Sequence, residues 1–144
     1  NLRGVFLGLQ AVAPAIRRAG GGAIVVTASS AGLRSDPELA AYSVAKRGAI
    51  ALVHSAATEM APWNIRVNAI CPGAVATPMT SAMDSGPGSA LALLHPLGRV
   101  GTPEDIAELV SFLAGERAGF ITGAAYPVDG GLTSVAVPRY RGNA

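Results

Sequence analysis

Short apolar segments alternate with longer ones along the chain, and the short ones predict strands. Residues 23–29, AIVVTAS, are apolar and β-branched without polar alternation, which is typical of a strand buried on both faces of a sheet. Residues 65–70 predict a second buried strand that Pro72-Gly73 closes, and residues 124–128 predict a third before Asp129-Gly130-Gly131. We therefore expect the chain to contribute three strands to one sheet.

The longer segments predict helices. Residues 1–19 carry apolar side chains around most of the helical surface, so this helix is expected to be covered on more than one side. Pro14 predicts a kink in it, and Gly20-Gly21-Gly22 predicts its end. Residues 41–60 predict a second helix, small and apolar over much of its surface. A third is predicted to start at Thr102 as N-cap, followed by a proline and two acidic residues.

The alternation of helix and strand places the chain in the α/β class. Apolar strands that alternate with helices predict a doubly wound parallel sheet, with helices on both faces. We expect one partial domain over residues 1–144, with a core over 1–136, a loose tail over 137–144, and a loop or lid over 76–98 that holds one helical turn. Ligands of such sheets bind beyond the carboxyl ends of the strands, where Ser29 and Pro72-Gly73 fall.

Composition narrows the function classes. Half of the 144 residues are hydrophobic and 14% are charged, which is enough apolar material for a buried core. The net charge is +2 and the arginines are scattered, so no nucleic-acid partner is expected. No apolar run is long enough to span a membrane, and no signal peptide is visible. The single cysteine, Cys71, cannot form an internal disulfide, and no Cys/His cluster has metal-ligand spacing, so we expect a cytoplasmic protein without a metal.

Three residues have spacings that chemistry can use. Tyr42 and Lys46 are four residues apart at the start of the second predicted helix, so they share a face. An ammonium group stabilises a nearby phenolate, so Lys46 is the kind of neighbour that makes a tyrosine a usable general acid/base. Ser29 ends the first predicted strand, where its hydroxyl can meet a substrate oxygen. Taken singly, the pair can be an ordinary helix face, and Ser29 or its neighbour Ser30 can satisfy local backbone groups.

Several short motifs, taken together in this order, resemble the short-chain dehydrogenase/reductase family over nearly the whole chain. They are Asn1-Leu2-x-Gly4, Ser29 followed by Tyr42-Ser43-Val44-Ala45-Lys46, Arg66-Val67-Asn68-Ala69-Ile70-x-Pro72-Gly73-x-x-x-Thr77, and Val128-Asp129-Gly130-Gly131. The resemblance implies a Rossmann-like sheet and an oxidoreductase that transfers a hydride between NAD or NADP and an alcohol or carbonyl carbon.

The resemblance also implies roles for individual residues. Tyr42 would donate or accept the proton, Ser29 would hold the substrate oxygen, and Lys46 would bind the nicotinamide ribose and activate the tyrosine. Asn1 would match the asparagine that helps to hold a proton-relay water. Besides Tyr42 and Lys46, the cofactor contacts would come from Pro72, Gly73, Val75 and Thr77. From the residues alone, His95 is expected to be structural or solvated, and Asp129-Gly130-Gly131 is expected to be a structural turn rather than a ligand site.

The sequence departs from the family pattern at its start. The glycine-rich Thr-Gly-x-x-x-Gly-x-Gly loop that binds the cofactor phosphates is absent, and Asn1 opens directly into the first predicted helix. We therefore interpret the sequence as a C-terminal fragment that folds poorly and is inactive alone, within an active parent. The residue that separates NAD from NADP would lie in the missing part.

Two other interpretations remain open: a non-catalytic family member that acts in binding or assembly, and a truncated gene product without function. The intact Ser29, Tyr42 and Lys46 argue against the first of them. The resemblance implies a homo-oligomer, dimer or tetramer, because the family commonly pairs the helices that correspond to residues 1–19 and 41–60. The small and apolar residues of 76–98 suggest a modestly apolar, non-acidic alcohol or ketone as substrate.

Overall fold

The computed structural model describes residues 1–83 and 85–134, and the predicted tail over 137–144 lies outside them. The longer elements, in chain order, are α1 (Arg3–Arg18), β1 (Gly22–Thr27), α2 (Ala40–Met60), β2 (Ile65–Pro72), α3 (Ala90–Leu93), α4 (Pro103–Ala114) and β3 (Ala125–Val128). Single 3₁₀ turns occur at Ser30–Gly32, Ala61–Trp63, Pro78–Thr80 and Glu116–Ala118. Helix and strand alternate as the sequence predicts.

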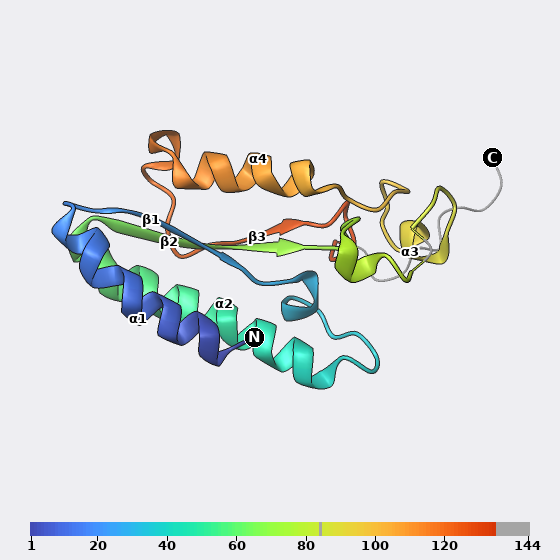
Figure 1. The fold of residues 1–144 in the computed structure, drawn as a ribbon, viewed down its shortest axis with the longest axis horizontal. Helices are drawn as coiled ribbons and strands as arrows, with labels where there is room; N and C mark the ends of the chain where they lie inside the picture. Colours follow the sequence, from blue (N-terminus) through green and yellow to red (C-terminus); the bar gives the residue numbers. More distant parts are fainter. Residues whose placement is uncertain (84, 135–144) are drawn as a thin grey trace.

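The three strands form one parallel sheet in the order β1-β2-β3. Helices α1 and α2 cover one face of it and α4 covers the other, so the arrangement is the predicted doubly wound one (Figure 1). β3 can contain Pro127 because it pairs only with β2 among the described strands, and an edge strand tolerates a residue without an N–H donor. The carboxyl ends of all three strands point toward the same edge (Figure 1).

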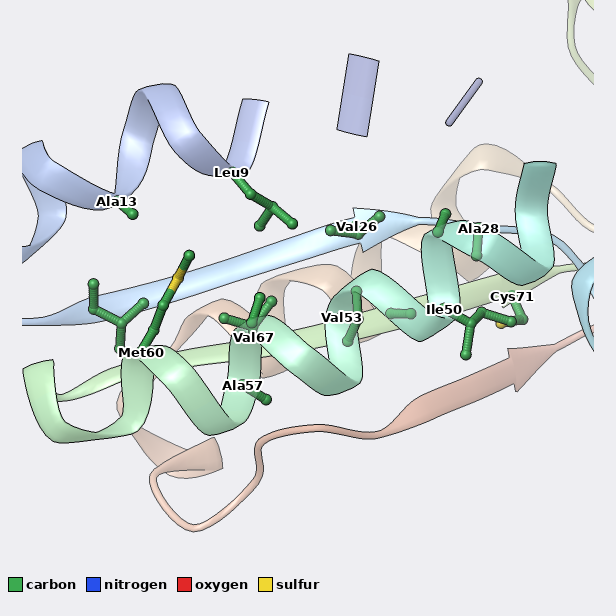
Figure 2. Close-up of a cluster of buried hydrophobic side chains, with 14 residues drawn as sticks. Leu9, Ala13, Val26, Ala28, Ile50, Val53, Ala57, Met60, Val67 and Cys71 are labelled. Atoms are coloured by element: carbon green, nitrogen blue, oxygen red, sulfur yellow. The ribbon is translucent and has the colours of Figure 1, made fainter. Parts of the chain in front are cut away.

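The buried core lies on both faces of the sheet. Between the sheet and α1 and α2 it consists mostly of small and β-branched side chains, with Leu9, Val53, Met60 and Val67 among the larger ones (Figure 2). On the α4 side, Ile70 and Leu113 are fully buried. Burying each such side chain stabilises the fold by about 1.5 to 3 kcal/mol, so the strands are fixed by packing from two sides.

Element boundaries differ from the predictions by one or two residues. β1 ends at Thr27 rather than near Ser29, and β2 continues to Pro72. Helix α1 continues through Pro14 to Arg18. The turn that follows needs glycine, because Gly21 has a φ of 121° and a side chain there would collide with Asn64.

Helix α4 starts as predicted, at the Thr102 cap. The Thr102 N–H donates to Asp105 Oδ2 at 2.8 Å, and the Asp105 N–H donates to Thr102 Oγ1 at 3.3 Å. The Arg99 guanidinium, hydrogen-bonded to Asp105, and the Thr102 N–H together hold the pKa of that carboxyl well below its ordinary value. The loop over 76–98 contains the predicted helical turn, which is α3.

Two polar side chains of β2 fasten α4 and the segment after it to the sheet. Arg66 donates through Nη1 to the Leu113 and Ile121 carbonyl oxygens at 2.8 and 3.3 Å, and through Nη2 to the Gly115 oxygen at 2.9 Å. Asn68, 1% exposed, donates to the Ile121 oxygen at 2.9 Å and accepts from the Ala124 N–H at 3.1 Å. The bonds to Leu113 and Gly115 satisfy carbonyl oxygens at the end of α4, and those to Ile121 and Ala124 satisfy backbone groups of the segment that leads to β3.

None of the helices within residues 1–83 and 85–134 is long and apolar enough to cross a membrane.

Candidate active site

The carboxyl edge of the sheet gathers the ends of all three strands. Ser29 follows β1, Gly73 follows β2, and Asp129 follows β3. Backbone hydrogen bonds continue beyond the strands, from the Ala28 N–H to the Ile70 oxygen at 2.8 Å and from the Gly73 N–H to the Val128 oxygen at 3.1 Å. The positions that the sequence placed at strand ends therefore share one edge.

Ser29 caps the 3₁₀ turn Ser30–Gly32. Its Oγ accepts a hydrogen bond from the Ala31 N–H at 3.1 Å. This local bond uses one acceptor position, so the hydroxyl proton can still be donated elsewhere. Ser30 is buried, whereas Ser29 is partly exposed, which distinguishes the two neighbouring serines as candidates. Cys71 lies fully buried next to the Ser29 backbone. Its burial raises the thiol pKa, and the Ser29 N–H acts in the opposite direction.

Tyr42 and Lys46 lie on the first turns of α2, as their spacing predicts. Lys46 Nζ donates to the carbonyl oxygen of Thr27, the last residue of β1, at 3.0 Å. The same Nζ lies 5.6 Å from the centroid of the Tyr42 ring. Within residues 1–83 and 85–134, the Tyr42 hydroxyl makes no hydrogen bond. The contacts of Lys46 Nζ thus connect α2, which carries Tyr42, to β1, which leads to Ser29.

The 3₁₀ turn after Ser29 is held tightly against α2. Arg47 Nε donates to the Gly32 oxygen at 3.1 Å, and Arg47 Nη2 donates to the Leu33 oxygen at 3.0 Å. A Cβ at Gly32 would lie 2.9 Å from the Lys46 carbonyl carbon and 3.0 Å from both the Lys46 oxygen and Ile50 Cδ1. The absence of a side chain at Gly32 is therefore what lets the turn approach the backbone of Lys46.

We expect Gly32→Ala to lower the free energy of unfolding by about 1 to 3 kcal/mol and to reduce turnover, because the new methyl group pushes the turn away from Lys46. The matched control is Gly8→Ala, on the exposed side of α1, where a Cβ meets no atom within 4 Å and the helix gains about 0.5 to 1 kcal/mol. Thermal melts of the two variants check this. Equal melting temperatures would contradict the close approach.

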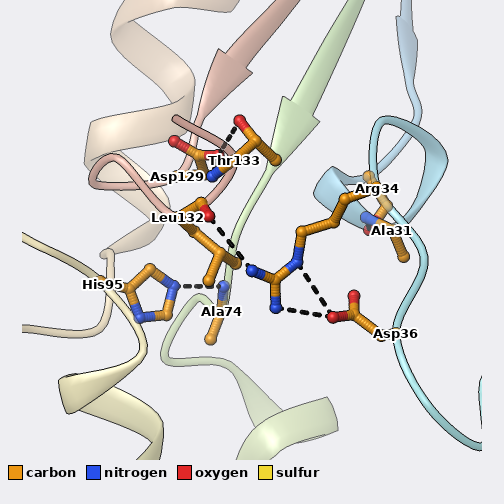
Figure 3. A network of polar contacts seen from close by, with 9 residues as sticks. Ala31, Arg34, Asp36, Ala74, His95, Asp129, Leu132 and Thr133 are labelled. Carbon is orange, nitrogen blue, oxygen red and sulfur yellow. Dashed lines mark hydrogen bonds and ion pairs between the residues drawn. The ribbon is translucent and has the colours of Figure 1, made fainter. Parts of the chain in front are cut away.

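The segment after β2 is ordered by His95, which the sequence predicts to be either structural or solvated. His95 is buried. Its Nε2 accepts from the Ala74 N–H at 3.1 Å (Figure 3). Its Nδ1 lies 2.9 Å from the Leu91 oxygen. A carbonyl only accepts and an amide N–H only donates, so the tautomer with a hydrogen on Nδ1 satisfies both contacts. Its Nε2 would also lie 2.7 Å from a Cβ at Gly73, so the ring fills the space beside that glycine.

Thr80 organises two further candidates, and sequence reasoning overlooked it. Its Oγ1 donates to the Val75 oxygen at 2.7 Å and accepts from the Thr77 N–H at 3.0 Å. Val75 also pairs with Gly101 in an isolated parallel bridge. The sequence signal that could have identified Thr80 is Thr77-Pro78 followed by Thr80, which is the pattern of a capped turn.

Asp129 is structural, as expected. Its carboxylate accepts from the Gly131 and Thr133 N–H groups at 3.0 and 2.8 Å and from Thr133 Oγ1 at 2.6 Å. Asn1 is different from the other candidates, since it lies exposed at the chain start and makes no hydrogen bond to any described residue. Among residues 1–83 and 85–134, no cluster of acidic, His or Cys side chains is arranged to hold a metal ion.

Comparison with known protein families identifies the family of this chain. The sequence model of a family described as enoyl-(acyl carrier protein) reductase matches residues 1–133. Cyclohexanol dehydrogenase from Acinetobacter is 43% identical over 134 residues, which are 93% of this chain and 52% of that protein. The chain belongs to the short-chain dehydrogenase/reductase family.

Other short-chain dehydrogenases/reductases support the assignment. The (3R)-3-hydroxyacyl-CoA dehydrogenase of Rattus norvegicus is 42% identical over 92% of this chain and 51% of its own length. A short-chain type dehydrogenase/reductase from Mycobacterium ulcerans superposes with a TM-score of 0.87 at 33% identity, covering 93% of this chain and 50% of that one. ElxO, solved with NADP bound, has a TM-score of 0.84 at 33% identity, over 92% and 54%.

This short-chain dehydrogenase/reductase segment spans about half the length of the curated relatives it matches. Its sequence contains the serine, tyrosine and lysine motifs but not the glycine-rich loop of the family.

Proposed function

We propose that the whole protein is an NAD(P)-dependent oxidoreductase that interconverts an alcohol and a carbonyl compound. The observation that carries this proposal is the position of Lys46, whose Nζ joins the end of β1 to the Tyr42 ring at the edge where Ser29 also lies. Such an arrangement supplies an acid/base, a cation beside it and a hydroxyl for the substrate oxygen.

The donors at this edge fit the nicotinamide end of such a cofactor. Lys46 Nζ uses one of its three N–H donors on Thr27, which leaves two for ribose hydroxyls. The nicotinamide ring would be lined by Pro72, which ends β2, and by Gly73, Val75 and Thr77, which follow it at the same edge. The bound nicotinamide would supply or accept the hydride, and NAD and NADP are both compatible with the described residues.

The chain's own residues would move the proton and hold the substrate. Tyr42, whose hydroxyl is unpaired among the described residues, would pass a proton to or from the substrate oxygen. Ser29 would donate to that oxygen while it accepts from the Ala31 N–H. Lys46 would favour the phenolate of Tyr42 by its charge. Asn1 would help to hold a proton-relay water.

The substrate we propose is a small secondary alcohol or its ketone. Relatives of similar identity are named for cyclohexanol and cyclopentanol, and another for a hydroxyacyl-CoA. The apolar side chains of Met79 and Met83 are exposed in the loop over 76–98 and would form part of the substrate wall. We also propose a cytoplasmic location, which suits a protein whose one cysteine is buried and reduced.

The test is turnover by the whole protein. Reduced nicotinamide is followed by its near-ultraviolet absorbance with NAD or NADP and a panel of cyclic and linear secondary alcohols and ketones. Turnover with at least one member is expected, and residues 1–144 alone are expected to give none. A whole protein that is folded but turns over none of the panel would overturn the proposal.

We further propose that the whole protein is a homo-oligomer that pairs through α1 and α2. A shallow groove of ≈ 610 Å³ between these helices is lined mostly by apolar and small residues, among them Phe6, which is 45% exposed. We expect Phe6→Asp to reduce the molar mass measured by light scattering. Met79→Asp, at an apolar side chain that is 91% exposed in the loop over 76–98, is the control and should leave the mass unchanged.

A further inference from the structure

Arg34 joins two parts of the carboxyl edge that are far apart in sequence. Its Nη1 donates to the Leu132 carbonyl oxygen at 3.1 Å, while Nε and Nη2 donate to Asp36 Oδ1 at 3.0 and 2.6 Å (Figure 3). Arg34 belongs to the loop after β1, and Leu132 to the turn after β3. Because β2 lies between these strands, the arginine side chain passes across the carboxyl end of β2.

The far end of this connection is rigid. Leu132 is 6% exposed, and its N–H donates to the Asp129 oxygen at 3.0 Å. The Asp129 carboxylate in turn holds Gly131 and Thr133, as described above. Arg34 is therefore anchored on a turn that is fixed to the end of β3.

The loop over residues 34–39, which carries Arg34, has few other contacts to the rest of the fold. Residues 34–39 connect Ser29 and its 3₁₀ turn to the start of α2, and most of them are exposed. Within residues 1–83 and 85–134, the bond from Arg34 to Leu132 is the one hydrogen bond that joins 34–39 to any segment outside 30–43. Asp36 aligns the guanidinium through a two-donor contact, and both side chains are partly shielded, at 34% and 21% exposure.

We infer that Arg34 is a positioning residue of the substrate site: by binding Asp36 and the Leu132 carbonyl together, it fixes the loop between Ser29 and Tyr42 across the end of β2. This inference rests on the proposed dehydrogenase function. Arg34 touches none of the reacting groups, so it acts by limiting the orientations that a bound alcohol can take.

Steady-state kinetics of the whole protein test this. We expect Arg34→Ala to raise KM for the alcohol and to lower kcat/KM for it about ten- to a hundredfold, with KM for the nicotinamide cofactor unchanged. Arg34→Lys, which keeps the charge but cannot reach both acceptors with a planar fork, should recover only part of the loss. Asp36→Asn, which keeps both Arg34 and an acceptor oxygen for its guanidinium, should retain most of the wild-type kcat/KM for the alcohol.

The control and the contradicting outcomes separate this inference from the proposed function. Arg117→Ala removes an arginine whose guanidinium lies over Phe112, beyond the end of α4, and should leave both KM values unchanged. An active wild type whose KM for the alcohol is unaffected by Arg34→Ala, or a loss in kcat alone that follows thermal stability, would overturn the positioning role and leave the dehydrogenase proposal standing. A wild type without turnover overturns both.

Discussion

Tyr42→Phe is expected to lower kcat of the whole protein by at least about a hundredfold, as the loss of a positioned acid/base predicts. The phenyl ring keeps its place near Lys46 Nζ, 5.6 Å from the centroid, so KM for the cofactor should change little. The substitution removes one oxygen that has no hydrogen-bond partner among the described residues, so the fold should keep its stability. Turnover and a thermal melt measure the two effects separately.

The matched control is Tyr126→Phe. Tyr126 lies on β3 and packs beside Ile70 and Leu113 on the α4 side of the sheet, away from α2. It loses the same hydroxyl and should keep kcat within about twofold, as a substitution away from the reacting groups does. If Tyr42→Phe retained most of the wild-type kcat, the proposed mechanism would be wrong even though the family assignment would stand.

Asn68→Asp is expected to have the largest effect on stability, a loss of about 3 to 5 kcal/mol in the free energy of unfolding at neutral pH. The introduced carboxylate would be buried and would face the Ile121 carbonyl oxygen, which now accepts from Asn68 Nδ2. The Ala124 N–H would keep an acceptor, so the penalty comes from the buried charge and the lost donor. For a domain of about 150 to 250 residues, such a loss lowers the melting temperature by about 6 to 20 °C.

The pH dependence of this variant has a definite sign. Burial raises the folded-state pKa of the introduced carboxyl above its unfolded value, so protonation favours the folded state. The variant should regain stability relative to wild type as pH falls through the folded pKa, because the protonated group can again donate to Ile121. Asn64→Asp, the same substitution at an exposed left-handed position, should show neither the loss nor this pH dependence. A constant difference between Asn68→Asp and wild type from neutral to acidic pH would contradict the buried contact.

Local sequence patterns predicted the parts of the molecule that depend on local physics. The apolar run before Ser29 and the Thr102 cap fix a strand and a helix start through burial and hydrogen bonds between near neighbours. The four-residue spacing of Tyr42 and Lys46 places both on the first turns of one helix. The conclusion that strand ends share an edge followed from parallel topology alone.

The contacts that hold the site together could not be predicted in this way. Arg34 and Leu132 are separated by 98 residues, and Arg66 and Leu113 by 47, so neither pair leaves a periodic signal in the sequence. His95 resembles any loop histidine until the fold places it against the Ala74 N–H. The role of Asn1 stays a prediction, because no described contact joins it to Tyr42 or Lys46.

The buried position of Cys71 makes its thiol a probe of local opening of the sheet. This thiol is the only one in the chain, has no exposed surface, and lies on β2 beside the Ser29 backbone. Burial and a raised pKa both suppress the thiolate that alkylating reagents attack, so the folded protein should be labelled slowly. Alkylation of Cys71 then requires local opening of the sheet next to Ser29. The alkylation rate therefore measures how often the site opens.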